Sequence, residues 1–337
     1  MFVDELARFA ADRADPPLAA VAERAAMPLR VAVRGRRGVG RRTVARALGR
    51  APGISVTAGP DTGAVDVVVY VTTEVVKPED AEAIGAAAAA GRPALAVLNK
   101  ADLAMLHRAD PRARCAEFAA AVGAPVEPMS GLLAVAALDG LDGGAWAALR
   151  AVAAAPGGAT CLDGSAAGFL AARLPVPADT RRRLLDGLGV FGTALSVAAL
   201  QRRETPARVR ALLRRLSGVD AVLQGIAVAG AEARYRRVLR AVAELEALAV
   251  CDGTVSDFLA RDDTVVARMA AAVDLAEAVG LGPLDGDDPG AHLPRALRWQ
   301  RYGRGDELGA LYRACAADIT RGSLRLWSRA HAPGACE

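Results

Sequence analysis

The feature that most constrains the fold of this chain is an apolar run that leads directly into a glycine-rich loop. Residues 29–35 (LRVAVRG) alternate as a β-strand does, and residues 35–43 (GRRGVGRRT) follow without a break. Gly35 and Gly40 are separated by four residues, which lets backbone N–H groups surround a diphosphate at a helix N-terminus. An ordinary exposed turn is the alternative. The residues assigned to a phosphate site are Gly35, Gly38, Val39, Gly40, Arg41, Arg42 and Thr43.

Further apolar runs predict a mostly parallel sheet around this loop. They are ISVTA at 54–58, DVVVYVT at 66–72, PALAVLN at 93–99 and PVEPMS at 125–130. The first three are continuous β-branched or apolar runs, as expected of strands that are buried on both faces. A helix is expected at 77–91, since Pro78 favours a helix start and Gly91 a helix end. A strand, a helix and a strand at this spacing form a βαβ unit, which places its two strands in parallel.

The second half of the chain has a different pattern and predicts an all-α domain. The hydrophobic content is 53% with only 4% aromatic residues, and the excess of alanine favours helices packed through small side chains. Helical stretches are expected at 179–202, 206–250, 254–280 and 306–328. We therefore expect an α/β domain at 1–155 that includes two N-terminal helices, a linker at 156–178 and a helical domain at 179–337. A length of 337 residues suits two domains.

Charge and composition exclude several classes of function. The chain has 42 basic and 38 acidic residues, and its arginine clusters lack interleaved aromatic residues, so nucleic-acid binding ranks last. The five cysteines and three histidines are scattered without metal-ligand spacing. The N-terminus lacks the apolar core of a signal peptide, and the apolar run at 187–200 is short for a membrane span, so a cytoplasmic protein is expected. Arg181–Arg183 precede that run, and we favour a buried core helix over peripheral membrane contact.

Lysine is so rare that its positions are informative. Only two of the 42 basic residues are lysines, and one of them, Lys100, lies in VLNKADL directly after a predicted strand. Asn99, Lys100 and Asp102 form an N-K-x-D pattern. A carboxylate at Asp102 would accept hydrogen bonds from guanine N1–H and the exocyclic amine, which adenine does not offer, and the stem of Lys100 would cover the base plane. Asn99 would connect this loop to the glycine loop. A polar helix start is the alternative interpretation.

Ser130 and Gly131 follow the last predicted strand, in EPMSGLLA. Together with the glycine loop and N-K-A-D, they make residues 29–150 resemble the Ras-like (TRAFAC) G domain, nearest to the Era and dynamin-like branches of bacteria. The resemblance implies a P-loop G domain in which a backbone N–H of the Ser130–Gly131 loop contacts the guanine carbonyl. It implies GDP and GTP as ligands and GTP hydrolysis as the reaction.

The family pattern is incomplete where hydrolysis depends on it. Arg41 stands at the position of the loop lysine and Arg42 at that of the hydroxyl that binds Mg²⁺, unless Thr43 replaces it after a shift of one residue. The closest match to a D-x-x-G motif is GPDTGA, which is one residue short. Its Asp61 could support a metal or belong to a tight turn. Little room remains for a full switch segment. We therefore expect weak dependence on Mg²⁺.

The sequence leaves two candidate functions. The first is a GTPase-class protein that binds guanine nucleotide, hydrolyses GTP slowly or with a partner, and acts through its helical domain. The second is a pseudo-GTPase scaffold with little or no turnover. Five arginines between residues 34 and 42 form a basic loop that would compensate for a weak metal site, dock an acidic protein partner or remain solvated. Catalytic residues are not identified.

Overall fold

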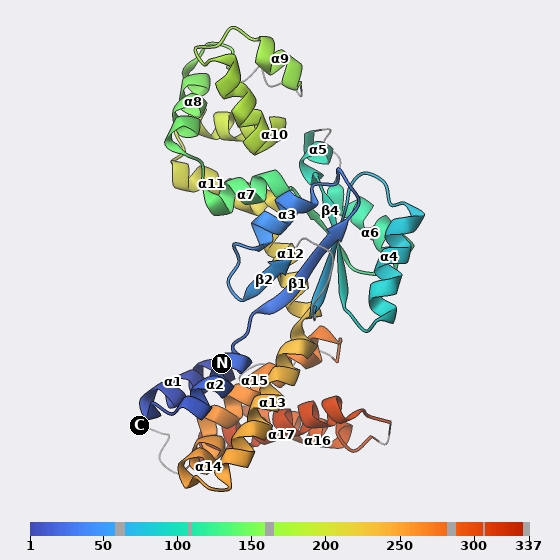
Figure 1. The fold of residues 1–337 in the computed structure, drawn as a ribbon, viewed down its shortest axis with the longest axis vertical. Helices are drawn as coiled ribbons and strands as arrows, with labels where there is room; N and C mark the ends of the chain where they lie inside the picture. The colour runs from blue at the N-terminus through green and yellow to red at the C-terminus, as the bar shows by residue number, and fades with distance from the viewer. Residues whose placement is uncertain (58–64, 107–109, 159–164, 282–287, 306, 333–337) are drawn as a thin grey trace. The chain divides into compact units, whose positions relative to one another are not determined.

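The computed structural model describes residues 1–57, 65–106, 110–158, 165–281, 288–305 and 307–332 (Figure 1). The chain forms two compact units. One unit contains the sheet and spans Arg30–Ala227, and the other combines Met1–Leu29 with Val228–Glu337. This division differs from the expected one, because the chain crosses between units near residues 29 and 228 and the expected linker at 156–178 belongs to the sheet unit.

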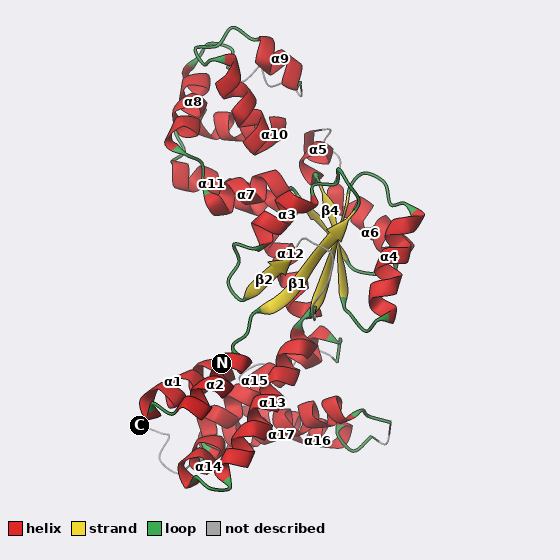
Figure 2. Cartoon of the chain, in the orientation of Figure 1, coloured by secondary structure: helices red, strands yellow, loops and turns green. Residues whose placement is uncertain are grey.

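The sheet has five strands, and Figure 2 shows them in yellow among the helices. They are β1 (Leu29–Gly35), β2 (Ile54–Thr57), β3 (Val67–Thr72), β4 (Ala94–Asn99) and β5 (Val126–Met129). Their order is β2-β1-β3-β4-β5, and the pairs β1–β3, β3–β4 and β4–β5 are parallel. Every residue of β3 is buried, as its continuous apolar sequence requires. The parallel sheet predicted from the apolar runs is therefore confirmed.

Helices cover both faces of this sheet. They are α3 (Arg41–Leu48), α4 (Pro78–Ala89), α5 (Ala101–Leu106), α6 (Pro111–Val122) and α12 (Val219–Ala229). On one face, Ile84 of α4 and Val122 of α6 pack with Tyr70 and Ala96. On the other face, α12 approaches so closely that a Cβ on Gly225 would lie 2.9 Å from Leu95 Cδ2. A side chain at that position would require the end of Leu95 to shift.

The sheet unit also contains a helical part that follows β5. Its helices are α7 (Gly131–Asp139), α8 (Gly143–Ala154), α9 (Ala166–Ala171), α10 (Ala178–Gln201) and α11 (Pro206–Ser217). They share one apolar core, in which Leu133 of α7 is buried with Leu184, Leu188 and Val197 of α10. Since α7 begins directly after β5, this core adjoins the outermost strand of the sheet.

The second unit is entirely helical and is built from both ends of the chain. Its elements are α1 (Phe2–Arg13), α2 (Pro16–Ala25), α13 (Ala231–Ala249), α14 (Gly253–Ala260), α15 (Asp262–Ala278), the 3₁₀ turn η2 (Pro289–Ala291), α16 (His292–Tyr302) and α17 (Ala310–Ala330). Phe2 and Leu6 are buried with Leu245 of α13. The Phe9 ring stacks on Phe258 with centroids 4.3 Å apart. The two N-terminal helices, expected in the α/β domain, thus bury their apolar faces against C-terminal helices.

Among the described residues, α10 is the helix that is long and apolar enough to cross a membrane by length and composition alone. Leu184, Leu188 and Val197 of this helix lie in a protein core, and 39% of its apolar window is buried. Arg181, considered for membrane contact, is buried and donates from Nη1 to the carbonyl oxygens of Phe169 (2.6 Å) and Ala172 (2.8 Å).

Candidate functional site

The carboxyl ends of the parallel strands form the edge where the candidate site residues gather. The register pairs Gly35 with Val71 and Asn99 with Met129, so the segments after β1, β4 and β5 emerge at one edge. Strand order reverses between β1 and β3, because β2 lies on one side of β1 and later strands lie on the other. Ligands of open α/β sheets bind at such a switch point, outside the carboxyl ends of the strands. The glycine loop after β1 lies at this point.

The glycine loop has a backbone that only glycine adopts without strain. Gly35 has φ 140°, and a Cβ there would lie 2.3 Å from the Val71 carbonyl oxygen. Gly38 has φ 85° and Gly40 has φ 84°. A Cβ on Gly40 would lie 2.3 Å from Asn99 Nδ2. The loop is thus held tightly against β3 and β4, and Gly40 then caps the start of α3.

Asn99 joins three segments of the site through its side chain. Its Nδ2 donates to the carbonyl oxygen of Val39 at 2.8 Å, and its Oδ1 accepts from the backbone N–H of Gly131 at 2.9 Å. The side chain is buried, so these hydrogen bonds do not compete with water. The connection between the N-K-A-D segment and the glycine loop that the sequence predicts is therefore present in the structure.

The Ser130–Gly131 loop is held differently from the expectation. The resemblance implies that a backbone N–H of this loop contacts the guanine carbonyl, yet the Gly131 N–H donates to Asn99 and the Ser130 N–H donates to the Ser217 carbonyl oxygen at 2.8 Å. The next N–H belongs to Leu132, in the first turn of α7, where helix geometry provides no intrahelical acceptor. The same holds for Leu133, so Leu132 and Leu133 are the residues of this segment whose N–H groups have no helix acceptor.

A cavity of about 390 Å³ lies beside these residues. It is lined by Gly40, Thr43, Asn99, Lys100, Asp102, Leu103, Ser130, Gly131, Leu132, Ala166, Leu185, Gly189 and Val190. The five residues that the sequence assigns to guanine recognition are all in its wall. The remaining wall, from α9 and α10, was not predicted, because nothing in the sequence pattern of these helices relates them to the loops of the sheet.

Two polar side chains in the wall are buried without partners. Asp102 is 7% exposed, and no described residue forms a hydrogen bond or ion pair with its carboxylate. Ser130 is 1% exposed, and its hydroxyl has no partner among the described residues. The Asp102 carboxylate faces the cavity without a protein donor, so its acceptor positions are left for water or for a ligand with N–H donors.

Lys100 is exposed at the mouth of the cavity and has φ 63°, a left-handed conformation rare outside glycine. Such backbone conformations are concentrated at functional sites, where the surrounding structure enforces them. Here Asn99 is fixed on both sides by hydrogen bonds, and α5 begins at Ala101, so the chain must turn sharply at Lys100.

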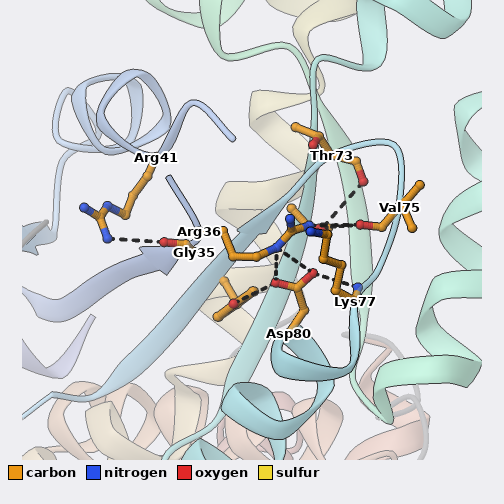
Figure 3. A network of polar contacts seen from close by, with 9 residues as sticks. Gly35, Arg36, Arg41, Thr73, Val75, Lys77 and Asp80 are labelled. Carbon is orange, nitrogen blue, oxygen red and sulfur yellow. Dashed lines mark hydrogen bonds and ion pairs between the residues drawn. The ribbon is translucent and has the colours of Figure 1, made fainter. Parts of the chain in front are cut away.

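The arginines of the glycine loop do not act as one patch. Figure 3 shows the Arg41 side chain directed back toward the end of β1, where its Nη1 donates to the Gly35 carbonyl oxygen at 3.2 Å. The sequence left open whether Arg41 approaches a phosphate from outside or extends into solvent, and it instead closes across its own loop. Arg37 and Arg42 are exposed. Arg36 points away, toward α4 (Figure 3).

Arg36 belongs to a buried polar network around Asp80. Its Nε donates to Asp80 Oδ1 at 2.8 Å and to Oδ2 at 3.1 Å. The Tyr70 hydroxyl donates to Oδ1 at 2.8 Å, and the Lys77 backbone N–H donates to Oδ2 at 2.9 Å. The last bond caps the N-terminus of α4. The other two were not predicted, since residues 36, 70 and 80 carry no shared local pattern.

This network fixes the charges of its members. Burial alone would raise the pKa of Asp80, but hydrogen bonds from Arg36, Lys77 and Tyr70 outweigh it and hold that pKa below its ordinary value. Burial and the hydrogen bond to Asp80 raise the pKa of Tyr70 to about 12. The hydrogen bond to Asp80 raises the pKa of Arg36 as well. The second residue of the glycine loop is therefore anchored to α4 by a permanent ion pair.

The residues described at this edge do not complete a magnesium site. Arg42 stands where a metal hydroxyl is expected, and the Thr43 methyl faces Gly131, since a Cβ on Gly131 would lie 3.3 Å from Thr43 Cγ2. Asp61 lies outside the described residues. Within the described part of the chain, no group of three His, Cys, Asp or Glu side chains is arranged to hold a metal.

Comparison with known proteins adds no relative. No protein-family model matches the chain. No curated protein is significantly similar to it in sequence.

Proposed function

We propose that this chain is a guanine-nucleotide-binding protein with a reduced P-loop G domain. The phosphates of GDP or GTP would lie in the loop Gly35–Gly40, and the base would enter the cavity between Thr43 and Asp102. The position of the glycine loop at the switch point supports this assignment. So does the Asn99 side chain, which holds the phosphate loop and the base-side segment in one fixed arrangement.

The observation that carries the proposal is the Asp102 carboxylate. It is buried in the cavity wall with no partner among the described residues. Guanine offers N1–H and an exocyclic amine as a pair of donors, which is the arrangement a carboxylate accepts best. Adenine presents an acceptor at N1 and would leave the carboxylate unpaired. The Leu132 N–H would donate to the guanine carbonyl in place of Gly131.

For hydrolysis, the described residues supply positive charge and positioned backbone N–H groups. Catalysis of phosphoryl transfer depends mainly on positioning and electrostatic stabilisation. Arg41 is the residue placed to contribute charge, but its guanidinium also bonds to Gly35 and does not offer the compact ammonium group of lysine. We therefore propose slow or partner-dependent GTP hydrolysis, with the helical segments or the exposed arginines as the contact for a protein partner.

A pseudo-GTPase scaffold is the second candidate. It is favoured by Arg42, which replaces the hydroxyl that would bind Mg²⁺. Equilibrium binding of fluorescent GDP with and without Mg²⁺ distinguishes the two candidates. Binding in either buffer supports the guanine-nucleotide-binding protein, for which the incomplete metal site predicts little effect of Mg²⁺, and no binding in either buffer supports the scaffold.

The decisive experiment is competition of GDP, GTP, ATP and xanthosine diphosphate against fluorescent GDP. ATP should bind at least about a hundredfold more weakly than GTP, because a buried charge left unpaired costs about 3 kcal/mol or more. Asp102→Asn should shift the preference toward the xanthine nucleotide, whose carbonyl accepts from the new amide. Asp186→Asn, at an exposed position of the same unit, is the matched control. Equal affinities for ATP and GTP would refute the guanine assignment.

A further inference from the structure

Helix α10 contributes a wall to the candidate base cavity, although it lies far along the chain from the sheet loops. Leu185, Gly189 and Val190 of α10 line the cavity together with Lys100 and Asp102. Leu185 and Val190 are half-buried, so each keeps part of its surface open to the cavity. The cavity thus has a polar edge from the sheet and an apolar side from α10.

The helix is broken where it meets the site. Gly189 has φ 67° and ψ 179°, which interrupts α10. A Cβ on Gly189 would lie 3.6 Å from Asp102 Oδ2 and 3.8 Å from Leu132 Cδ1. The Thr193 hydroxyl donates to the Gly189 carbonyl oxygen at 2.6 Å and satisfies one acceptor at the break. The break therefore brings the backbone of α10 against the carboxylate that the proposed function assigns to the base.

A second glycine fixes α10 to the helix that begins at the site. A Cβ on Gly192 would lie 2.4 Å from Leu133 Cδ2, so the backbone of α10 packs directly on a side chain of α7. Both helices also contribute to the same buried core. Since the N-terminal turn of α7 borders the cavity, displacement of α10 would disturb packing that continues to the base site.

From these contacts we infer that α10 is the second wall of the nucleotide site and controls nucleotide release. The inference rests on the proposed function. A purine base is flat, with apolar faces and a polar edge. Asp102 and Leu132 N–H would meet the edge, while Leu185 and Val190 would cover a face opposite the Lys100 stem. A base covered on this side by α10 would leave faster when α10 is displaced or loses its apolar contacts, so bound nucleotide and the position of α10 are coupled.

The test is the dissociation rate of fluorescent GDP, measured by stopped flow after addition of excess unlabelled GDP. Leu185→Ala should raise this rate about tenfold, since affinity changes of related complexes lie mostly in dissociation. Leu195→Ala is the matched control, because Leu195 is a half-buried leucine of the same helix that packs on the same core and does not line the cavity. That control should change the rate less than about twofold. Circular dichroism melts of both variants report whether the fold is intact.

The outcomes separate this inference from the function beneath it. Wild-type protein that binds fluorescent GDP, with equal release rates from wild type and Leu185→Ala, would overturn the role of α10 and leave the proposed function intact. An equal increase in both variants would also overturn it, because general loosening of the core would then suffice. Wild-type protein that binds no GDP would refute the proposed function and the inference together. If Leu185→Ala does not fold, Val190→Ala gives the same comparison at the adjacent wall position.

Discussion

Replacement of Asp80 by asparagine tests whether the polar network behind the glycine loop stabilises the sheet unit. The carboxylate is 1% exposed and accepts from Arg36, Tyr70 and the Lys77 N–H. Asparagine keeps the shape but turns an amide N–H₂ toward these donors. Removing one partner of a buried ion pair costs about 3 to 5 kcal/mol, and the partial exposure of Arg36 lowers this to about 2 to 3 kcal/mol. We expect the melting temperature to fall by about 4 to 12 °C.

The assay should report on the sheet unit, because two units need not unfold together. Amide hydrogen exchange of β3 and β4 gives the local free energy of unfolding, and thermal melts give the overall change. Glu79→Gln, at the exposed neighbouring position, is the control and should change stability by less than about 0.5 kcal/mol. A double-mutant cycle of Asp80→Asn with Arg36→Gln should show non-additive effects on stability. Additive effects in that cycle, or an Asp80→Asn effect as small as the control, would refute the reasoning.

Three further predictions concern the site and its surroundings. Gly40→Ala should lower affinity for fluorescent GDP by at least about a hundredfold, because the new Cβ would strike Asn99 and adopt a strained φ; affinity equal to wild type would contradict the loop geometry. Tyr70 keeps its proton in the folded state up to about pH 12, so its contribution to stability is complete below pH 10 and is lost between pH 10 and 12; thermal melts of wild type should converge on those of Tyr70→Phe over this window. Arg41→Lys with Arg42→Ser should strengthen the Mg²⁺ dependence of GTP binding before it raises single-turnover hydrolysis, whereas brisk, strongly Mg²⁺-dependent turnover by wild type would show that the loop is already complete.

The sheet and the loops at its edge were predictable because their signals are local. Each strand is a short apolar run, and parallel strands bring their carboxyl ends to one edge whatever lies between them. The glycine loop, Asn99 and Ser130 could therefore be expected near one another from their positions after three strands. Register pairing of Gly35 with Val71 and Asn99 with Met129 shows the common edge.

The surfaces against which the helices pack could not be predicted from local sequence patterns. The spacing of Phe2, Leu6 and Phe9 predicts a helix with one buried face, but any apolar surface could receive it. In the structure, that face packs against α13 and α14. Likewise, the stretch 206–250 was expected to be continuously helical, whereas Gly218 and Gly230 divide it into three helices. Gly218 has φ 73°, which ends α11 in a left-handed cap.

The wall of the cavity and the anchor of the loop depend on contacts between distant segments. Gly189 stands in an alanine- and leucine-rich helix, and nothing in GLGVFG distinguishes a break over a cavity from ordinary small-residue packing. Arg36 and Asp80 are separated by 44 residues, and each has a local explanation, as a basic loop and as a helix cap. Only the three-dimensional arrangement shows that the two explanations describe a single ion pair.

The assembly of the helical unit from both ends of the chain has a consequence for synthesis. Residues of α1 and α2 leave the ribosome well before α13 and α14, on which their apolar faces pack and which are made about 200 residues later. At roughly 5 to 20 residues per second, the nascent helices wait on the order of 10 to 40 s. All segments of the sheet unit are synthesised during that interval, so the sheet unit can fold before α13 and α14 are made. Helices α1 and α2 are thus buried long after they are made, and Phe2, Leu6 and Phe9 are side chains that a chaperone would meet on the nascent chain.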